Sequence, residues 1–436
     1  MSFINSKNLF DFFVSKGAVK QFYKMLAEND NSKQQIYLGS SFSVLHQLPF
    51  GNITEFPDNQ VPNFKADIEL YWINDQGETE RALGAQLILY PKYPEVRLSG
   101  FLKGCRTAPS ENMKPVPKEQ RITNNAKDGR ILFFAVTNDR KLYAYLAKKD
   151  SAISKEILAG LQTDDLPVLN EFIIDKNTQS AKEVLLSKLK ALVKKDKIAS
   201  CRMFPDGQVR PYTAVNAGGY TMEASFDIIP NGTAEPDFKG WELKAFSGST
   251  ITLMTPEPDK GLYKEIKAKE FAVTYGHKKD GYISYFTGPF RCGEYNENSG
   301  LTMILKGYDN KKKTITDPSG GIYLVDTKNN AAAVWSFSLL LKHWCKKHAH
   351  ACYLKYKKEK EGDAVFYKYL SPVLLGEGTY FELFLSALYD GKIIYDPGIS
   401  VKKTETGGTK VKARSQFRIS VKNLAVLYES FQSADV

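Results

Sequence analysis

Three charged residues near the middle of the chain, Asp237, Glu242 and Lys244, have types and a spacing that suit phosphodiester chemistry. Glu242 and Lys244 flank a single residue, so on a β-strand both side chains project from the same face. A turn at Asp237 can bring its carboxylate beside that of Glu242. Two converging carboxylates suit a hard cation such as Mg²⁺, and an adjacent lysine can orient an attacking water. The same spacing also fits a solvated turn at a strand edge. The flanking sequence is therefore needed to distinguish a catalytic site from such a turn.

The flanking sequence over 218–246 is GGYTMEASFDIIPNGTAEPDFKGWELKAF, followed after a short linker by ITLMTPEP. It resembles the catalytic core of the MvaI/BcnI family of restriction endonucleases, which is related to the mismatch-repair nicking enzyme MutH. The resemblance implies a PD-(D/E)XK-type nuclease in which Asp237 and Glu242 hold Mg²⁺ and Lys244 positions or helps to deprotonate water. It also implies that Glu223 stands where the family has a further glutamate that completes the acidic site.

The length of 436 residues exceeds what one hydrophobic core usually organises, which predicts two domains. We expect a β-rich effector or DNA-binding domain over 1–175, a linker helix over 176–194 and the nuclease domain over 195–436. The pattern Ser180-x-x-Glu183 is typical of a capping box at the start of that helix. The expected fold class is α+β or α/β, with a β pseudobarrel-like first domain and a central mixed sheet flanked by helices in the second.

The first 150 residues show an amphipathic opening helix and then short alternating segments, such as 67–72 and 85–90, which predict strands. The pieces KMLAEND, QIYLG and GRILFFAV resemble the N-terminal effector-binding domain of the EcoRII restriction enzyme. That resemblance implies a β pseudobarrel, akin to the DNA-binding domain of certain plant transcription factors, whose basic loops read duplex DNA. Alternating charge at a soluble strand edge is the alternative. The candidate reading residues, all in the segment PKYPEVRLSGFLKGCR, are Lys92, Arg97, Lys103 and Arg106.

Further elements are predicted in the second half of the chain. Segments 271–276 and 282–286 have the composition of strands, and 331–347 has the apolar face and basic end of a strong helix. His343, His348 and His350 lie in or just after that helix. Because no Cys/His spacing of a metal site accompanies them, we expect them to interact favourably with the C-terminal end of the helix dipole.

A second polar pattern lies near the C-terminus. Segment 411–420 alternates like a strand and presents Arg, Gln and Arg on one face, while a DP turn follows the strand-like start of 393–399. In the major groove arginine can read guanine, glutamine adenine and aspartate cytosine, and the loop GGTKVKARS suits phosphate contacts. In the MvaI/BcnI family the comparable turn and strand belong to the DNA-reading side, although relatives often carry a histidine there that this chain lacks. A polar face on an edge strand is the alternative. The candidates are Asp396, Lys412, Arg414, Gln416 and Arg418.

The formal net charge of +11 lies beyond residue 175, because residues 1–175 carry as many acidic as basic side chains. A basic second part is typical of polyanion binding, since Lys and Arg that neutralise phosphates release counterions; lysine runs that merely solubilise loops are the alternative. The five cysteines form no CxxC pair and suit a reducing compartment. We see no apolar run of membrane-spanning length and no signal-peptide pattern, so we expect a cytoplasmic prokaryotic protein with no membrane partner.

Together the two resemblances imply a type II restriction endonuclease that makes Mg²⁺-dependent cuts in double-stranded DNA at a short GC-flanked site such as CCWGG. They also imply stimulation by a second, effector DNA copy at the first domain, and a monomer that nicks the two strands in turn. Two alternatives stay open: a MutH-like repair enzyme that nicks one strand, and a catalytically silent DNA-binding regulator. The intact set of Asp237, Glu242 and Lys244 argues against the silent regulator.

Overall fold

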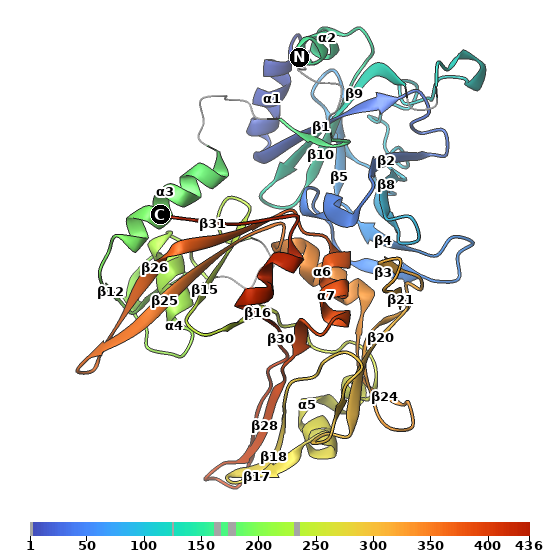
Figure 1. Ribbon diagram of the computed structural model, residues 1–436. Helices are drawn as coiled ribbons and strands as arrows, with labels where there is room; N and C mark the ends of the chain where they lie inside the picture. The colour runs from blue at the N-terminus through green and yellow to red at the C-terminus, as the bar shows by residue number, and fades with distance from the viewer. Residues whose placement is uncertain (1–2, 124–125, 161–166, 173–179, 231–235) are drawn as a thin grey trace. The chain divides into compact units, whose positions relative to one another are not determined.

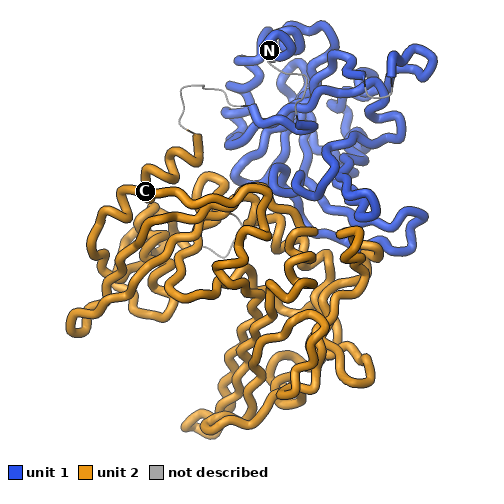
Figure 2. The backbone as a smooth tube through the Cα atoms, in the orientation of Figure 1, with its two compact units in different colours: residues 1–178 blue, residues 179–436 orange. Residues whose placement is uncertain are grey.

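Two units, residues 1–178 and residues 179–436, divide the chain (Figure 2). The computed structural model describes residues 3–123, 126–160, 167–172, 180–230 and 236–436. Both units combine helices with several β-sheets, so the protein has a mixed α and β fold. Among the described residues, no helix combines the length and the apolar character needed to cross a bilayer.

Unit 1, residues 1–178, is built on two sheets, with strand orders β11-β1-β9-β10-β5-β6 and β2-β8-β7-β4-β3 (Figure 1). The helices that accompany them are α1 (Ser6–Ser15) and α2 (Ala152–Ala159). The strands are β1 (Ala18–Ala27), β2 (Gln35–Gly39), β3 (Ile53–Phe56), β4 (Asn63–Asp67), β5 (Leu70–Ile73), β6 (Thr79–Arg81), β7 (Gln86–Tyr90), β8 (Glu95–Ser99), β9 (Lys127–Thr137), β10 (Leu142–Ala147) and β11 (Asn170–Glu171).

The opening helix predicted from the sequence is confirmed as α1. Its N-terminus is capped by Asn5, whose side chain accepts a hydrogen bond from Asn8 N at 2.9 Å. Leu9, Phe10 and Phe13 are buried and pack in one core with side chains of the first sheet and of α2. The amphipathic pattern thus arises because one face of this helix packs against a sheet.

Segment 67–72, which we expected as one strand, is instead divided between the two sheets. Strand β4 ends at Asp67 and pairs with β7 in one sheet, whereas β5 begins at Leu70 and pairs in parallel with β10 in the other. The alternating pattern continues across this change of sheet because both strands bury alternate residues. The expected strand at 85–90 is confirmed as β7.

One sheet of unit 2, called the site sheet below, carries the central charged residues. Its order is β12-β26-β25-β15, and β31 also pairs with β26. β15 runs parallel to β25 and the other neighbours are antiparallel, so the sheet is mixed. Its strands are β12 (Ile198–Ala199), β15 (Trp241–Phe246), β25 (His350–Glu361), β26 (Ala364–Glu377) and β31 (Ser430–Ala434).

Helices α3 (Ala181–Val193) and α4 (Ala217–Ser225) pack against the site sheet. Leu189 of α3 and Met222 of α4 share a core with Leu243 of β15. The predicted capping box is present at the start of α3, where Ser180 Oγ accepts from Glu183 N at 3.2 Å and the Glu183 carboxylate accepts from Ser180 N at 2.8 Å. The helix that we expected as a linker therefore forms part of the core of unit 2.

Two excursions of the chain, between β15 and β25 and between β26 and β31, build three smaller sheets, here called the inserted sheets. Their orders are β16-β30-β27, β17-β18-β28-β29 and β19-β20-β23-β24 (Figure 1). Their strands are β16 (Thr250–Met254), β17 (His277–Lys279), β18 (Tyr282–Thr287), β19 (Tyr295–Asn296), β20 (Leu301–Lys306), β23 (Gly321–Val325), β24 (Ala331–Ser336), β27 (Ile393–Tyr395), β28 (Gly398–Lys403), β29 (Thr409–Lys412) and β30 (Phe417–Ser420). The helices in these excursions are α5 (Leu262–Tyr275), α6 (Phe337–Lys347) and α7 (Phe381–Tyr389).

Two predictions in this part were wrong. Segment 271–276 is not a strand, because its residues up to Tyr275 form the end of α5, which packs against β18, β24 and β28. Segment 331–347 is not one helix, because its first part pairs with β23 as strand β24. The helix α6 begins only after Ser336, whose side chain accepts from Leu339 N at 3.2 Å. The expected strand at 282–286 is confirmed as β18.

Candidate active site

A two-residue turn places Asp237 beside strand β15. The ends of the turn 238–241 exchange backbone hydrogen bonds of 2.9 and 2.8 Å, and between them Lys239 and Gly240 have φ values of 46° and 87°. Positive φ at both central positions is typical of a type I′ hairpin turn, and glycine adopts it without strain. The chain therefore doubles back directly after Asp237, whose Oδ2 accepts a hydrogen bond from Leu243 N at 2.9 Å.

Glu242 and Lys244 lie on the same face of β15, as their spacing predicts. Lys244 Nζ donates a hydrogen bond to Glu242 Oε1 at 3.1 Å. Glu242 is only 4% exposed, and burying a carboxylate costs free energy unless positive charge compensates it. In the adjacent strand β25, Ala351 is the register partner of Glu242 and Tyr353 that of Lys244.

A second lysine, Lys347, which the sequence did not single out, reaches the same carboxylate. It lies in the last turn of α6, and its Nζ is 3.7 Å from Glu242 Oε2. Strand β25 begins at His350, shortly after α6 ends, and His350 is in register with Trp241, the residue before Glu242. The parallel pairing of β25 with β15 therefore places Lys347 next to Glu242. The sequence signal was only the basic end of a helix, which does not reveal that pairing.

Glu223, on α4, belongs to the same group of charges. Burial raises its pKa to about 7, and the negative charges of Asp237 and Glu242 act in the same direction. Burial also raises the pKa of Asp237 to about 6, again with a contribution from Glu242. Lys347 opposes both shifts, because a nearby positive charge favours the ionised carboxylate. The structure thus brings together all four predicted site residues, Lys244 included.

Asp237 and Glu242 offer two carboxylates to a hard cation. Glu242 Oε2 is buried and has no hydrogen-bond partner among the described residues, which leaves this oxygen available to a metal. Within the described ranges, no group of three His, Cys, Asp or Glu side chains is assembled for a metal. Water and backbone oxygens would therefore complete the coordination shell. A donor set made of oxygen atoms fits Mg²⁺, which keeps several waters when it binds protein carboxylates.

Two of the three histidines in or after α6, His348 and His350, pack against tryptophan rings. His348 is buried and stacks on Trp344 with ring centroids 4.3 Å apart, and the ring of His350 lies 5.2 Å from that of Trp241. Burial lowers the pKa of His343, and two neighbouring lysines add to this effect. Their expected interaction with the helix dipole stays a prediction.

Segment 411–420, expected as one alternating strand, is divided in the structure. Strand β29 ends at Lys412 and pairs with β28, whereas β30 begins at Phe417 and pairs with β16 and β27. The residues between them belong to no strand. The prediction of a single polar strand face was therefore wrong, because two different sheets take up the two ends of the segment.

The predicted DNA-reading residues nevertheless gather around Asp396. Arg418 Nη1 lies 2.5 Å from Asp396 Oδ2 in an ion pair. Backbone hydrogen bonds from Asp396 N to Gln416 O at 2.7 Å and from Gly398 N to Arg414 O at 2.9 Å hold the stretch between β29 and β30 against the DP turn. Arg414 is exposed, as is Lys412 at the end of β29. Sequence-distant segments thus form one polar cluster of candidate base-reading groups.

In unit 1 the predicted reading residues lie on and around β8. Arg97, within β8, is half-buried and contacts Glu95 at 2.7 Å and Gln35 at 3.1 Å. The other three are exposed, in the turn before β8 or in the loop that follows it: Lys92, Lys103 and Arg106. Arg97 therefore differs from them in being fixed by neighbouring side chains.

The model of the MvaI/BcnI restriction endonuclease family matches residues 186–428, more than half of the chain, and this range includes the four acidic and basic site residues. Two solved structures that are similar to the chain are restriction endonuclease MvaI in complex with its cognate DNA substrate, at 17% identity and a TM-score of 0.46, and MvaI in the absence of DNA, at 15% and 0.33. Each match covers 59% of this chain and 99% of MvaI. No curated protein matches the chain. The chain therefore belongs to the MvaI/BcnI restriction endonuclease family and is, by that membership, a DNA endonuclease.

Proposed function

We propose that unit 2 is a type II restriction endonuclease of the PD-(D/E)XK type, which cuts double-stranded DNA at a short specific sequence in a Mg²⁺-dependent reaction. The observation that carries this proposal is the arrangement of Asp237, Glu242 and Lys244. A tight turn holds the first carboxylate against β15, and the second is buried beside the lysine. Family membership supports the metal, because restriction endonucleases generally use a divalent cation.

Each site residue has its own task in this reaction. Mg²⁺ bound to Asp237 and Glu242 would offset the negative charge that develops on the scissile phosphate. Lys244, held by Glu242 Oε1 at 3.1 Å, orients the attacking water and assists the loss of its proton. Glu223, with a pKa raised to about 7, can exchange a proton with water near neutral pH. Lys347 supplies positive charge at the opposite oxygen of Glu242, at 3.7 Å, and suits contact with a phosphate oxygen of bound DNA.

The polar cluster around Asp396 is the proposed base-reading surface. Exposed Arg414 suits guanine, Gln416 suits adenine, and the ion pair of Asp396 with Arg418 offers an acceptor and a donor held in fixed positions. Exposed Lys412 suits a phosphate. By the resemblance to the two restriction-enzyme families, the proposed target is GC-flanked, of the CCWGG kind, and is cut by a monomer that nicks each strand in turn.

Unit 1 is the proposed effector domain, a β pseudobarrel-like fold that binds a second DNA copy through its basic loops. The exposure of Lys92, Lys103 and Arg106 supports this role. Deleting residues 1–178 should abolish stimulation by an added uncleavable duplex and leave the chemistry intact, because all proposed active-site residues lie in unit 2. Cleavage rates of both proteins, with and without the added duplex, measure this. A truncated enzyme that is still stimulated would contradict the effector role.

The function is tested by incubating the purified protein with unmethylated supercoiled plasmid and Mg²⁺, with EDTA as a control, and then sequencing the product ends. We expect linear fragments that share one end sequence. Asp237→Ala and Lys244→Ala should each reduce cleavage by at least about a hundredfold while DNA binding, measured by gel shift in Ca²⁺, stays largely intact. Retained cutting by either variant contradicts the site assignment. Nicked circles that never become linear would favour the MutH-like alternative, and no metal-dependent cleavage would favour the silent regulator.

A further inference from the structure

Unit 1 contains a cavity that the proposed function does not use. Its volume is about 490 Å³, and it lies between β1, the loop that follows it, β2, β8 and the start of β9. Four cationic side chains line it, and the carboxylate among its lining residues is that of Asp30. The cations are Lys24, Lys33, Arg97 and Lys127. Lys24 is paired with Asp30, and Arg97 with Glu95. Lys33 and Lys127 therefore leave the cavity with an excess of positive charge.

The loop that forms one wall, residues 28–34, is held in place by side-chain contacts. Asp30 Oδ2 accepts a hydrogen bond from Ala27 N at 2.8 Å, and Asn31 Nδ2 donates to Met113 O at 2.9 Å. Asn31 has a φ of 68°, a left-handed conformation that persists in a residue other than glycine when its surroundings impose it. The wall of the cavity is therefore preformed.

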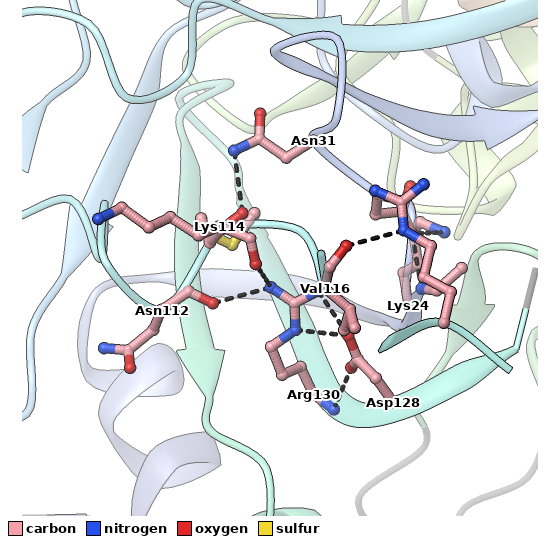
Figure 3. A network of polar contacts seen from close by, with 11 residues as sticks. Lys24, Asn31, Asn112, Lys114, Val116, Asp128 and Arg130 are labelled. Carbon is pink, nitrogen blue, oxygen red and sulfur yellow. Dashed lines mark hydrogen bonds and ion pairs between the residues drawn. The ribbon is translucent and has the colours of Figure 1, made fainter. Parts of the chain in front are cut away.

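The nearby carboxylates are already paired and do not neutralise the whole cavity. Lys24 Nζ lies 2.9 Å from Asp30 Oδ2, and both side chains are almost completely buried. Asp128, next to Lys127 in the chain, is bound by Arg130, whose Nε donates to Asp128 Oδ2 at 2.8 Å (Figure 3). Arg130 also donates to two backbone carbonyl oxygens of the neighbouring loop, at 2.8 and 2.9 Å (Figure 3). The charge of Asp128 is thus balanced by Arg130.

Two lysines of the cavity, Lys33 and Lys127, carry charge outside its ion pairs, although the negative charges of Asp30 and Asp128 act on Lys127. Within the part of the chain that the structure describes, neither Lys33 nor Lys127 is in an ion pair. Loss of hydration lowers the pKa of Lys127, and the positive charge of Lys24 adds to that effect. Crowded cations in a concave site are unfavourable in the empty protein, and an anion that enters the site relieves their repulsion.

We propose that this cavity binds the phosphate group of a single nucleotide. Its volume of about 490 Å³ falls within the range of about 300–1,000 Å³ that holds small molecules. A duplex, whose major groove alone is about 12 Å wide, is too large to enter as a whole, so a DNA bound to unit 1 would place only one of its nucleotide phosphates in the cavity. Lysine and arginine are the side chains that bind phosphate through charge-assisted hydrogen bonds. Amide and hydroxyl groups of the remaining lining, on Asn29, Gln35 and Tyr37, are placed to contact the sugar or the base.

The nucleotide has two possible sources, a free nucleotide or one nucleotide unit of a DNA bound to unit 1. The phosphate chemistry is the same for both. For a free nucleotide the inference goes beyond the proposed function, and for a unit of bound DNA it rests on the proposed effector role of unit 1. It does not rest on the nuclease, since it concerns residues of unit 1 and is tested without Mg²⁺. Failure of nucleotide binding would leave plasmid cleavage unaffected, so the two proposals fail separately.

The test is calorimetric titration of the full chain, in EDTA and low salt, with deoxycytidine 5′-monophosphate, with deoxycytidine and with a short duplex. The double variant Lys33→Ala/Lys127→Ala removes the two cations that are in no ion pair, both at exposed positions, and spares the buried pair. Lys149→Ala/Lys155→Ala, at exposed positions outside the cavity lining, is the matched control. Thermal unfolding of both variants checks that they fold like the parent.

For a free nucleotide, we expect the monophosphate to bind at least about tenfold more tightly than the nucleoside, since a charged phosphate contact contributes on the order of a factor of ten. The cavity variant should lose that advantage, and the control should keep it. For a nucleotide unit of DNA, the duplex should bind instead, and the cavity variant should bind it more weakly, with a salt dependence reduced by about one phosphate contact. The proposal is wrong if the cavity variant and the control bind both ligands equally, or if neither ligand binds the parent.

Discussion

Lys347 Nζ lies 3.7 Å from Glu242 Oε2, the carboxylate oxygen that Lys244 does not contact. The buried carboxylate is thus held between two ammonium groups that come from different elements, β15 and α6. Together with Asp237 and Glu223, the site has three carboxyl groups against two lysines. When all are ionised, an excess of negative charge remains to attract a divalent cation.

Replacing Lys347 should shift the pH dependence of cleavage. Lys347 lowers the pKa of both Asp237 and Glu223, so Lys347→Ala should move the acid limb of the pH–rate profile to higher pH. Lys346→Ala, on the same last helical turn, is the control and should leave the acid limb in place. Single-turnover rates at several pH values measure this. Equal profiles for the two variants would show that Lys347 does not act on the carboxylates.

The parent enzyme should lose activity as the pH falls through the range of about 7 to 6. Asp237 has a pKa raised to about 6 and Glu223 one raised to about 7, so each carries its proton below that value and binds a cation poorly. Because metal and proton compete for the same oxygens, more Mg²⁺ should move the midpoint to lower pH. Cleavage rates at two Mg²⁺ concentrations, from about pH 5 to about pH 9, test the competition. A midpoint that does not respond to Mg²⁺ would assign the titration to another group.

Asp237→Asn should stabilise the protein while it abolishes cleavage. The folded-state pKa of about 6 lies above the usual value of about 3.9. The favourable contribution of the protonated form is therefore complete below about pH 4 and is lost as the pH rises through about 6. Asparagine does not ionise, so the folded protein keeps this stability as the pH rises. Its side-chain oxygen can still accept the hydrogen bond from Leu243 N. In EDTA at pH 8 we expect Tm to rise by a few degrees, since about 1 kcal/mol corresponds to about 2–4 °C.

The pH and metal dependence of the same variant provide the controls for that effect. Near about pH 3 the parent and Asp237→Asn should unfold at almost the same temperature, because the parent carboxyl is then largely protonated in both states. Mg²⁺ should raise Tm of the parent at pH 8 and leave that of the variant almost unchanged, since a ligand stabilises only a protein that binds it. Equal Tm shifts with Mg²⁺ would place the metal elsewhere.

Arg414 and Lys412 should contribute differently to DNA binding. Lys412→Ala should weaken binding to all sequences alike and reduce the salt slope by about one, as expected for a phosphate contact. Arg414→Ala should cost about 1–3 kcal/mol at the target site and relax the preference at one base pair. Binding to the target and to single-base variants at several salt concentrations separates the two effects. If Arg414→Ala weakened binding to all sequences equally, Arg414 would be assigned a contact with the DNA backbone.

The central site could be predicted from the sequence because its parts are local. Asp237, Glu242 and Lys244 lie within one turn and one strand, and a turn with Gly240 at its second central position fixes their relation. The capping box at Ser180 was predictable for the same reason, since it depends on residues three positions apart.

Features that depend on long-range pairing could not be predicted in this way. The role of Lys347 depends on the parallel pairing of β25 with β15, strands that lie about a hundred residues apart in the chain. Segment 411–420 has the alternation of one strand, but its two ends pair with strands of two different sheets. Segment 271–276 has strand-like composition, and its packing against β18, β24 and β28 makes it helical. In each case tertiary contacts outweigh local preference.

The first excursion leaves the site sheet after β15 and returns to it through α6 and β25, so its two attachment points are the strand of Glu242 and the helix of Lys347, whereas the second excursion leaves after β26 and returns at β31. In the proposed function, target choice and bond cleavage are therefore encoded in separate stretches of one polypeptide that meet at four junctions. This gives a route for redesign: the excursions could be exchanged between relatives at these junctions, with the site sheet kept unchanged. The two junctions of the first excursion could also transmit mechanical strain from a poorly fitting sequence to both sides of the buried glutamate.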